Sequence, residues 1–524
     1  MDPKNPLVMI FPAEPLKHNA HYAVSVISAK DKNGRKLPRT KGIIKVMKAT
    51  NSETRARFVG KLIPAIQTAA PWFSLKKEPD SLQLLFDFVT VSEESQLGPV
   101  RAARDIALEH VQKWNWDDHA RVVSIIDDDC DVDDGDNASL IARTVHLSLD
   151  VPSFLHYESR YSFLDQKKIQ REDDVTIGEA KAILQIPCSL MHQTVGGRSG
   201  KELRAIVETG HGLFGNRGEM ESDYFQEMGN DNGYIMMAMD WRGMSSFDLP
   251  VVIKTLIAKP DLFQAVRDNL IQGYANKFCL QHFSQNGMLN LEAFKFHGQS
   301  IPTLGGDPPT SIFYGISQGG ILGGGYVSLA GKTKLIERGI LGVPGTPFSL
   351  VLTRSRDFTE YDKLLLLNFY NNRHVRIFLG LMQMAWDSTE ASGLQARPVS
   401  EPIPRLLLQA GLGDAIVPTI AAETLARAMG ASTLPGNHRS IFGVPVESAA
   451  TNGSLGPDVT LSELMYEEEY NTLPIENTFA ESNDVHWCVR LDKAMVEQVE
   501  EFINTGRVID PCRKDQCKRE SADC

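Results

Sequence analysis

The segment from residue 308 to 331 constrains the fold of this 524-residue chain more than any other. It begins with the strand-like run Ser-Ile-Phe-Tyr-Gly-Ile, continues as Gly315-Ile-Ser-Gln-Gly319, and ends in a glycine-rich stretch typical of a tightly packed helix. A strand that turns directly into a helix at such a G-x-S-x-G pentapeptide exposes its serine, because the flanking glycines remove side chains that would collide there. The helix N-terminus then directs free N–H groups at the serine. The segment therefore predicts that Ser317 is a nucleophile.

The sequence after residue 140 alternates strand-like runs with helical patterns. The apolar runs that read as strands end in turns, and helical stretches follow several of them, as at residues 249–285 and 419–430. Such alternation predicts an α/β fold with a mostly parallel sheet covered on both faces. With 42% hydrophobic residues and ample length, the composition excludes a small disulfide-stapled scaffold and a disordered chain.

From about residue 140 to 506 the chain resembles an α/β-hydrolase. Its Gly-Ile-Ser-Gln-Gly-Gly segment is similar to the nucleophile turn of cutinases, acyl-protein thioesterases and several secreted lipases. The whole chain most resembles bacterial lipases with an Ig-like N-terminal domain, because a Pro-Leu pair precedes the Tyr-x-Val-x-Val run at 22–26. The resemblance implies an α/β-hydrolase core, a helical cap insertion and a small β-rich, Ig-like α+β domain at the N-terminus.

An oxyanion hole needs two backbone N–H donors aimed at one point. In this family one donor is the residue after the nucleophile, here Gln318. The other comes from the loop after an earlier strand, and the segment Thr209–Gly215 has the His-Gly-x form of that loop. The resemblance implies Leu213 as the second donor, with Phe214 the next candidate. His211 would then be a structural member of the loop rather than the catalytic base.

The remaining members of a triad are an acid and a base. The segment Gly411–Pro418 matches the family pattern Gly-x-x-Asp-x-x-Val-Pro and implies Asp414 as the acid, although a helix N-cap is the alternative role for this residue. His486 precedes an amphipathic helical segment, as expected for the catalytic histidine. His438 is the alternative base. The order Ser317, Asp414, His486 agrees with the order in this fold.

An insertion between about residues 345 and 402 has a high density of apolar residues and is predicted to be a cap over the serine. Some of these residues are candidate walls of an acyl pocket, and the alternative is that most of them pack the cap onto the core. The candidates for the acyl pocket are Phe214, Leu365, Phe369, Phe378, Leu379, Met382 and Trp386.

The predicted domains are 1–134 (N-terminal Ig-like α+β), 135–510 (α/β-hydrolase) and 511–524 (a polar, cysteine-containing tail). The acidic loop near Asp131 and Asp133 departs from a calcium loop in its glycine and glutamate positions and is interpreted as a solvated linker. Four scattered cysteines are interpreted as buried or free thiols, and a disulfide within the tail is expected in an exported protein. These cysteines are Cys130, Cys188, Cys279 and Cys488, and those of the tail are Cys512, Cys517 and Cys524.

The net charge of −12 disfavours nucleic acid as a partner, since no long basic cluster offsets it. Residues 308–331 are uncharged but too rich in glycine for a membrane span, so no transmembrane segment is predicted. No metal and no cofactor is expected. The predicted location is the cell surface or outside if a leader was removed, and otherwise the cytoplasm. Oligomeric state is not predicted.

These observations predict a serine carboxylic ester hydrolase of esterase or lipase type that acts on a small-molecule or lipid ester, with transient contact to a lipid interface. Its mechanism would pass through an acyl-enzyme. An alternative keeps the triad but cleaves a peptide or a polyester. An alternative of another class is a non-catalytic binding or adhesion protein, against which three intact triad positions argue.

Overall fold

The computed structural model describes residues 9–49, 53–72, 80–130, 139–191, 200–396, 399, 401–471, 483–512 and 517–524. The expected linker at Asp131 and Asp133 lies outside these residues. The chain forms two compact units, one of Leu16–Ser95 and one of Met1–Pro15 with Gln96–Cys524. None of the described helices is both long and apolar enough to cross a membrane.

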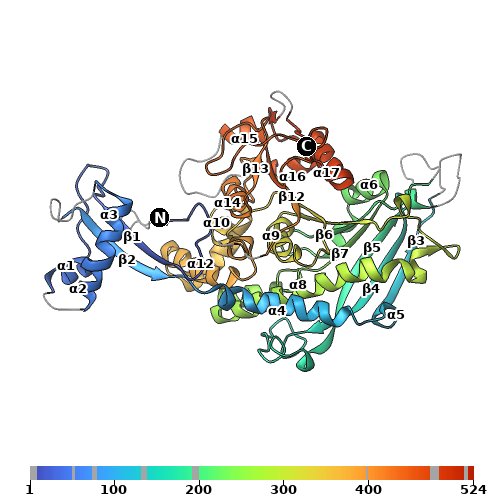
Figure 1. The fold of residues 1–524 in the computed structure, drawn as a ribbon, viewed down its shortest axis with the longest axis horizontal. Coiled ribbons are helices and arrows are strands. Elements are labelled where there is room, and N and C mark those ends of the chain that lie inside the picture. The colour runs from blue at the N-terminus through green and yellow to red at the C-terminus, as the bar shows by residue number, and fades with distance from the viewer. Residues whose placement is uncertain are drawn as a thin grey trace. The chain divides into compact units, whose positions relative to one another are not determined.

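The larger unit is built on one eleven-stranded sheet (Figure 1). Its strands are β3 (Ala120–Asp127), β4 (Ile141–Ser153), β5 (Thr176–Pro187), β6 (Ala205–Gly210), β7 (Tyr234–Met239), β10 (Thr310–Ile316), β11 (Arg338–Gly342), β12 (Arg405–Leu412), β13 (Ser432–Thr433), β14 (Val459–Tyr466) and β15 (Lys518–Arg519). The order is β13-β14-β12-β11-β10-β6-β7-β5-β4-β3, and β15 pairs with β14. A separate hairpin joins β8 (Lys295–Phe296) to β9 (Gln299–Ser300).

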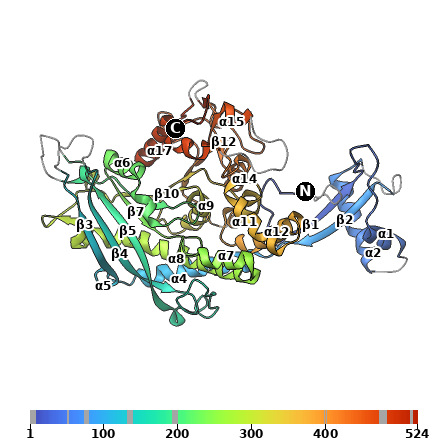
Figure 2. The same ribbon diagram turned by 180° about the vertical axis from the view of Figure 1, so that it is seen from behind.

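The strands from β13 to β7 run parallel to their neighbours, whereas β5, β4 and β3 are antiparallel. Figure 2 shows these antiparallel strands side by side at one end of the sheet. Neighbouring parallel strands need crossover connections, which helices supply here. A mostly parallel sheet with helices on both faces and a strand–serine–helix turn after β10 is the α/β-hydrolase fold.

The two faces of the sheet bury two separate cores, because side chains alternate along each strand. On β10, Phe313 lies in one core and Ile312 and Tyr314 lie in the other. Helices α4 (Glu93–Val111), α8 (Phe263–Asn286), α9 (Gln318–Ala330) and α14 (Thr419–Met429) contribute to the first core. Helices α6 (Asp223–Asn232), α16 (Val485–Leu491) and α17 (Lys493–Thr505) contribute to the second. Burial on both faces explains the continuous apolar runs in the sequence.

The boundary between the units differs from the one expected at residue 134. Helix α4 buries Leu97, Val100 and Val111 in the core of the larger unit, and β3 extends the sheet by pairing with β4. Residues from Gln96 onward therefore belong with the larger unit. The short helix α5 (Trp116–His119) connects α4 to β3.

The predicted insertion between 345 and 402 is helical. It contains α10 (Phe348–Leu352), α11 (Thr359–Asn368), α12 (Asn372–Trp386) and α13 (Ala391–Leu394). Two other helices of this unit, α7 (Leu249–Ile257) and α15 (Glu467–Asn471), lie outside the insertion, and α7 contacts α11.

The smaller unit pairs β1 (His21–Ile27) with β2 (Leu82–Val89) as an antiparallel ribbon. Its helical elements are α1 (Lys41–Lys48), α2 (Glu53–Arg57), the π-helix η1 (Phe58–Leu62) and α3 (Ile63–Ala69). A small core containing Ile43, Phe58 and Leu82 joins the ribbon to these helices. An Ig-like sandwich packs two sheets face to face. The described residues of this unit form one two-stranded ribbon, so the expected Ig-like architecture is wrong for them.

Three disulfides link six of the seven cysteines: Cys130–Cys188, Cys488–Cys524 and Cys512–Cys517. The interpretation of Cys130, Cys188 and Cys488 as thiols is wrong, because the fold brings each within bonding distance of a partner far away in the sequence. Cys279 is a buried thiol, as expected.

Candidate active site

Ser317 lies in the turn between β10 and α9, in a backbone conformation that few residues adopt. Its φ is 61° and its ψ is −125°. The surrounding glycines are required by close backbone contacts: a Cβ on Gly319 would lie 2.0 Å from the carbonyl oxygen of Gly210, and one on Gly315 would lie 2.1 Å from that of Gly319. A hydrogen bond from the Ser317 N–H to the carbonyl oxygen of Gly342, at 2.9 Å, stabilises this strained conformation. Strain of this kind at a nucleophile is characteristic of functional turns.

The side chain of Gln318 ties this turn to the loop after β6. Its Nε2 donates to the carbonyl oxygens of Gly212, at 3.2 Å, and Met244, at 2.9 Å. The backbone N–H of Gln318 is in the first turn of α9, where no intrahelical acceptor exists. Leu213 follows Gly212 and, with Phe214 and Ser317, lines one pocket. The two residues expected as oxyanion donors, Gln318 and Leu213, are therefore brought together next to the serine.

His211 is held as a neutral structural residue beneath this loop. Its Nδ1 lies 2.9 Å from the Gly212 carbonyl oxygen, and its Nε2 accepts the backbone N–H of Trp241 at 2.9 Å. Burial lowers the pKa of His211 to about 4, so the ring stays uncharged near neutral pH. With both ring nitrogens engaged by the backbone, His211 positions the loop, as the sequence indicates.

Asp414 and His486 form a buried pair at the carboxyl end of the sheet. Oδ2 of Asp414 lies 2.7 Å from Nδ1 of His486. The other oxygen, Oδ1, accepts the N–H groups of Ile416 at 2.7 Å and Val417 at 2.9 Å, which fixes the carboxylate. Oδ1 of Asp414 therefore caps the turn at Ile416 and Val417, whereas the N-cap position of α14 is Pro418, so the alternative role of Asp414 as a helix N-cap is wrong. Helix α16 brings His486 here because Val485 packs against the side-chain-free Gly411 of β12.

His438, the alternative base, lies on an exposed loop after β13. Its neighbours Asn437 and Arg439 bind Glu463, and no hydrogen bond among the described residues joins His438 to Asp414. The structure therefore brings His486, and not His438, to the acid.

Ser317 follows β10, and Asp414 follows β12, with β11 between them in the sheet. Because the carboxyl ends of parallel strands meet at one edge, the serine and the Asp414–His486 pair lie at the same edge of the sheet. Nδ1 of His486 is engaged by Asp414, which leaves Nε2 to meet a nucleophile. Among the described residues no hydrogen bond yet joins the Ser317 hydroxyl to His486, and such bonds commonly tighten only when substrate binds.

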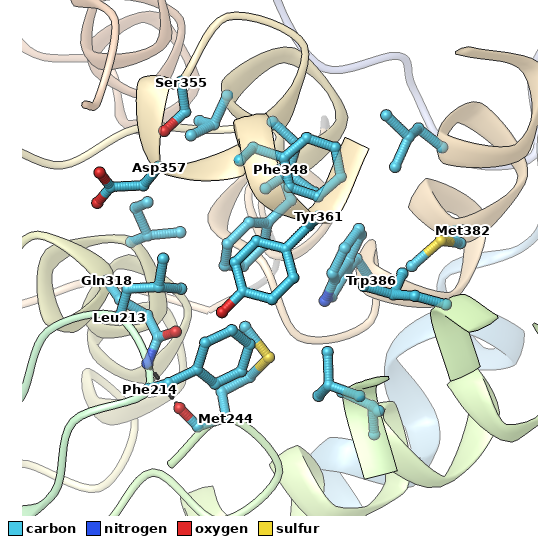
Figure 3. Close-up of a pocket in the computed structure, with 18 of the residues that line it drawn as sticks. Leu213, Phe214, Met244, Gln318, Phe348, Ser355, Asp357, Tyr361, Met382 and Trp386 are labelled. Carbon is cyan, nitrogen blue, oxygen red and sulfur yellow. Dashed lines mark hydrogen bonds between the residues drawn. The ribbon is translucent and has the colours of Figure 1, made fainter. Parts of the chain in front are cut away.

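A pocket lined by Ser317 and by residues of the helical insertion lies beside the serine. Figure 3 shows side chains that line this pocket, among them Gln318, Phe214 and Trp386. Of the candidate acyl-pocket residues, Phe214, Leu379, Met382 and Trp386 line it. Leu365, Phe369 and Phe378 are not among its lining residues: Leu365 is fully buried, and the rings of Phe369 and Phe378 stack on each other at 4.9 Å. These three side chains therefore pack the cap onto the core, which is the alternative role considered for them from the sequence.

Sequence reasoning missed much of the pocket wall, both outside the cap and within it. The missed wall residues include Met244, Val252, Thr255, Leu256, Phe263 and Val266 outside the insertion, and Phe348 and Tyr361 within it. The apolar run of α7 is a signal for a buried helix, but it does not indicate which cavity the helix faces.

A buried ion pair supports the strand that leads to the oxyanion loop. Lys277 on α8 and Glu208 on β6 are 2.8 Å apart, and both are fully buried. Gln281 and Tyr326 donate to the second oxygen of Glu208, and the ammonium of Lys277 lies 4.1 Å from the Trp241 ring centre. Both oxygens of the Glu208 carboxylate are therefore hydrogen-bonded, and the Lys277 ammonium is paired with a counter-charge and packed on an aromatic ring, as a buried charge requires.

A second buried carboxylate anchors the base of the cap. Glu390 accepts the N–H of Phe348 at 2.9 Å and the hydroxyl of Thr346 at 3.0 Å. Burial, together with the nearby carboxylate of Asp387, raises the pKa of Glu390 to about 7. Burial also raises the pKa of Asp387 to about 6. The start of α10 is therefore held by a group that titrates close to neutral pH.

Within the described ranges, no group of three or more His, Cys, Asp or Glu side chains is arranged to hold a metal ion. The residues gathered near Ser317 are of the types that nucleophilic acyl transfer uses.

No family model and no curated protein matches the chain. Among solved structures, it is similar to acetyl xylan esterase 1 from Thermoanaerobacterium sp. JW/SL YS485, with 12% identity over 71% of this chain and 89% of that one and a TM-score of 0.38. It is also similar to an esterase from Pyrobaculum calidifontis, with 13% identity over 63% of this chain and 82% of that one and a TM-score of 0.32. An acetyl xylan esterase from Paenibacillus sp. R4 is 13% identical over 71% of this chain and 91% of its own, with a TM-score of 0.33. At these values the likeness assigns neither a family nor a substrate to this chain.

Proposed function

We propose that this chain is a serine carboxylic ester hydrolase of esterase or lipase type, with Ser317, Asp414 and His486 as its triad. The observation that carries the proposal is the buried 2.7 Å contact between Asp414 and His486 at the same edge of the sheet as Ser317 in its left-handed turn. A carboxylate in this position holds the imidazole in the tautomer that has Nε2 free to accept a proton.

In the proposed mechanism, Nε2 of His486 accepts the proton of the Ser317 hydroxyl as its oxygen attacks the ester carbonyl carbon. The negative charge that develops on the carbonyl oxygen is stabilised by the N–H groups of Gln318 and Leu213. His486 then donates the proton to the departing alcohol, which leaves an acyl group on Ser317. Water, activated by His486, hydrolyses this acyl-enzyme and releases the carboxylic acid.

The pocket beside Ser317 supports a substrate with an apolar acyl group. Its walls are mainly aliphatic and aromatic, from the loop after β6, the helical insertion, α7 and α8. Burying an apolar chain there contributes about 0.8 kcal/mol per CH₂. Neither a metal nor a cofactor enters the proposed chemistry.

The outer face of the cap supports transient contact with a lipid interface. Helix α12 is apolar on two sides: Leu379 and Met382 face inward, whereas Ile377, Leu381 and Met384 are exposed, Met384 to 71%. The end of α11 adds Leu367, 73% exposed, and Tyr370, 96% exposed, follows it. These five exposed residues are called the outer cap face below. Apolar clusters of this kind mark protein or membrane contact sites.

The three disulfides support folding in an oxidising environment, because such bonds are rare in proteins kept reduced in the cytosol. We therefore favour export over a cytoplasmic location.

Turnover of p-nitrophenyl esters, from acetate to palmitate, with and without an emulsified interface, tests this proposal. We expect hydrolysis by the wild-type protein and its loss in Ser317→Ala, with the thermal unfolding midpoint retained. Turnover that persists in Ser317→Ala would contradict it. The chain-length series also measures how far the pocket accepts an acyl chain.

A further inference from the structure

Helix α16, which carries His486, is cross-linked to the segment 517–524 by the Cys488–Cys524 disulfide (Figure 1). Cys488 is two positions after His486, and at about 100° per residue the two side chains leave the helix on nearly opposite sides. His486 contacts Asp414 on one side of the helix. On the other side Cys488 is buried and bonded to Cys524. The short helix is therefore held between the proposed acid and the segment 517–524.

The segment 517–524 is itself fixed to the central sheet. Its strand β15 pairs in parallel with β14, with Tyr466 opposite Arg519. The backbone N–H of Ala522 donates to Oε1 of Glu469 at 3.0 Å, and the side chain of Ala522 is buried in the second core. The disulfide therefore ties α16 to the sheet through β14.

A second contact from the same segment fixes the end of α16. The guanidinium of Arg519 donates to Asp492 from Nε at 2.7 Å and from Nη2 at 2.9 Å. Asp492 is the residue at which α16 ends, and its Oδ1 also accepts the N–H of Ala494 in the first turn of α17, at 3.0 Å. A planar two-point contact of this kind restricts orientation as well as distance. The junction between α16 and α17 is therefore fixed relative to β15.

These contacts bear on the chemistry because the position of His486 relative to Ser317 depends on where α16 lies. Ser317 and Asp414 are held by the turns after β10 and β12, whereas His486 is placed by a helix of seven residues. A misplacement of about 1 Å between reacting groups can cost about 10²-fold in rate. None of the described residues 517–524 lines the pocket, so they can act on the rate without altering the pocket wall.

We propose that the segment 517–524 is a positioning element for His486, acting through the disulfide to α16 and the ion pair at the end of that helix. This inference rests on the proposed ester hydrolase function and adds residues that set its rate. Removing the disulfide should lower kcat for p-nitrophenyl esters by at least about ten-fold. KM should stay within about three-fold, because the residues of the pocket wall are unchanged. A role in stability alone would lower the unfolding midpoint without this split between kcat and KM.

The test compares the double variants Cys488→Ala/Cys524→Ala and Cys130→Ala/Cys188→Ala, both assayed well below their unfolding midpoints. The first removes a link between residues 36 positions apart, and the second, the matched control, a link between residues 58 positions apart. Both should lose comparable stability, because the entropy of loop closure varies only with the logarithm of loop length. The control disulfide joins the ends of β3 and β5, on the antiparallel side of the sheet. We expect kcat to fall in the first variant and to stay within about two-fold of wild type in the control.

Arg519→Gln is an independent probe that leaves every cysteine in place. It should lower kcat by at least about three-fold with KM retained. Lys518→Gln, which removes the same charge from the neighbouring position of β15, is its control and should leave kcat unchanged.

A kcat in Cys488→Ala/Cys524→Ala equal to that of wild type, or equal losses of kcat in both disulfide variants, would overturn the inference. If Cys488→Ala/Cys524→Ala does not fold, Arg519→Gln decides, and a kcat equal to that of Lys518→Gln would overturn it. In either case hydrolysis by the wild-type protein leaves the proposed ester hydrolase function standing. A wild-type protein that hydrolyses no ester would remove that function, and this inference with it.

Discussion

Nδ1 of His486 lies 2.7 Å from Oδ2 of Asp414, with both side chains buried, although the two residues are 72 positions apart in the chain. The contact fixes which ring nitrogen remains for the serine. Since Oδ1 of Asp414 is taken by two backbone N–H groups, the carboxylate cannot rotate away without losing them. The geometry of the base is therefore set by the turn after β12.

We expect Asp414→Asn to lower kcat for p-nitrophenyl esters by about 10³- to 10⁴-fold, because an amide in place of Oδ2 favours the wrong tautomer of His486. Asn retains an oxygen for the N–H groups of Ile416 and Val417, so the unfolding midpoint should change little. His486→Ala should lose activity to a similar degree, and His438→Ala is the matched control that should retain it. Activity lost in His438→Ala and kept in His486→Ala would reassign the base.

The local part of this site could be predicted from sequence, because its signals are contiguous. The turn at Ser317 is predicted by glycines that lie within five residues of one another. The choice of Asp414 is predicted by a pattern of eight consecutive residues. The wall formed by α7 and α8 could not be predicted, since apolar periodicity shows that a helix is buried but not what it packs against. The same limit explains the misplaced domain boundary: the apolar face of α4 is visible in the sequence, whereas its partner is not.

The disulfides and the smaller unit were missed for related reasons. Pairing of Cys488 with Cys524 depends on where the C-terminus packs, and spacing alone does not determine it. The Tyr-x-Val-x-Val run at residues 22–26 does form a strand, β1, as its alternation predicts. The number of strands that surround it is a property of the whole unit, and here the described part has one partner strand.

The buried pair Lys277–Glu208 gives a prediction about stability. Lys277→Met leaves the Glu208 carboxylate buried without its counter-charge, so we expect the free energy of unfolding to fall by about 3–5 kcal/mol. The double variant Lys277→Met/Glu208→Gln removes both charges and should recover a substantial part of this loss. Urea unfolding followed by circular dichroism measures both values. A loss below about 1 kcal/mol in the single variant would show that the pair does not act as described.

Glu390 gives a prediction about pH. Its pKa of about 7 in the folded protein exceeds the ordinary value of 4.5, so the folded state binds a proton more tightly between these two pH values. Stability should therefore decrease as pH rises through this window, by up to roughly 3 kcal/mol from this group, and then level off. In Glu390→Gln the decrease should be clearly smaller, with Asp387 accounting for what remains. Thermal unfolding at pH 5 to 8 measures this, and an unchanged slope in the variant would contradict it.

The outer cap face gives a prediction about interfaces. Replacing two of its exposed residues, as in Leu367→Ser/Met384→Ser, removes apolar area from the surface without touching the pocket wall. We expect hydrolysis of emulsified long-chain esters to fall several-fold, because lipid binding scales with buried apolar area. Hydrolysis of a soluble short-chain ester should stay within about two-fold. Val123→Ser, on the exposed edge strand β3, is the control and should affect neither. Equal loss on both substrates in the double variant would argue against an interfacial role.

The central claim is that Ser317 is an activated nucleophile, and covalent labelling tests it most directly. A fluorophosphonate reacts with a serine whose proton is removed by a neighbouring base and whose oxyanion is stabilised, and these are the features assigned to Ser317, His486 and the N–H groups of Gln318 and Leu213. We predict stoichiometric labelling that peptide mass spectrometry localises to Ser317, with none in Ser317→Ala and strongly slowed labelling in His486→Ala. An unlabelled wild-type protein, or a label on another residue that persists in Ser317→Ala, would contradict the account.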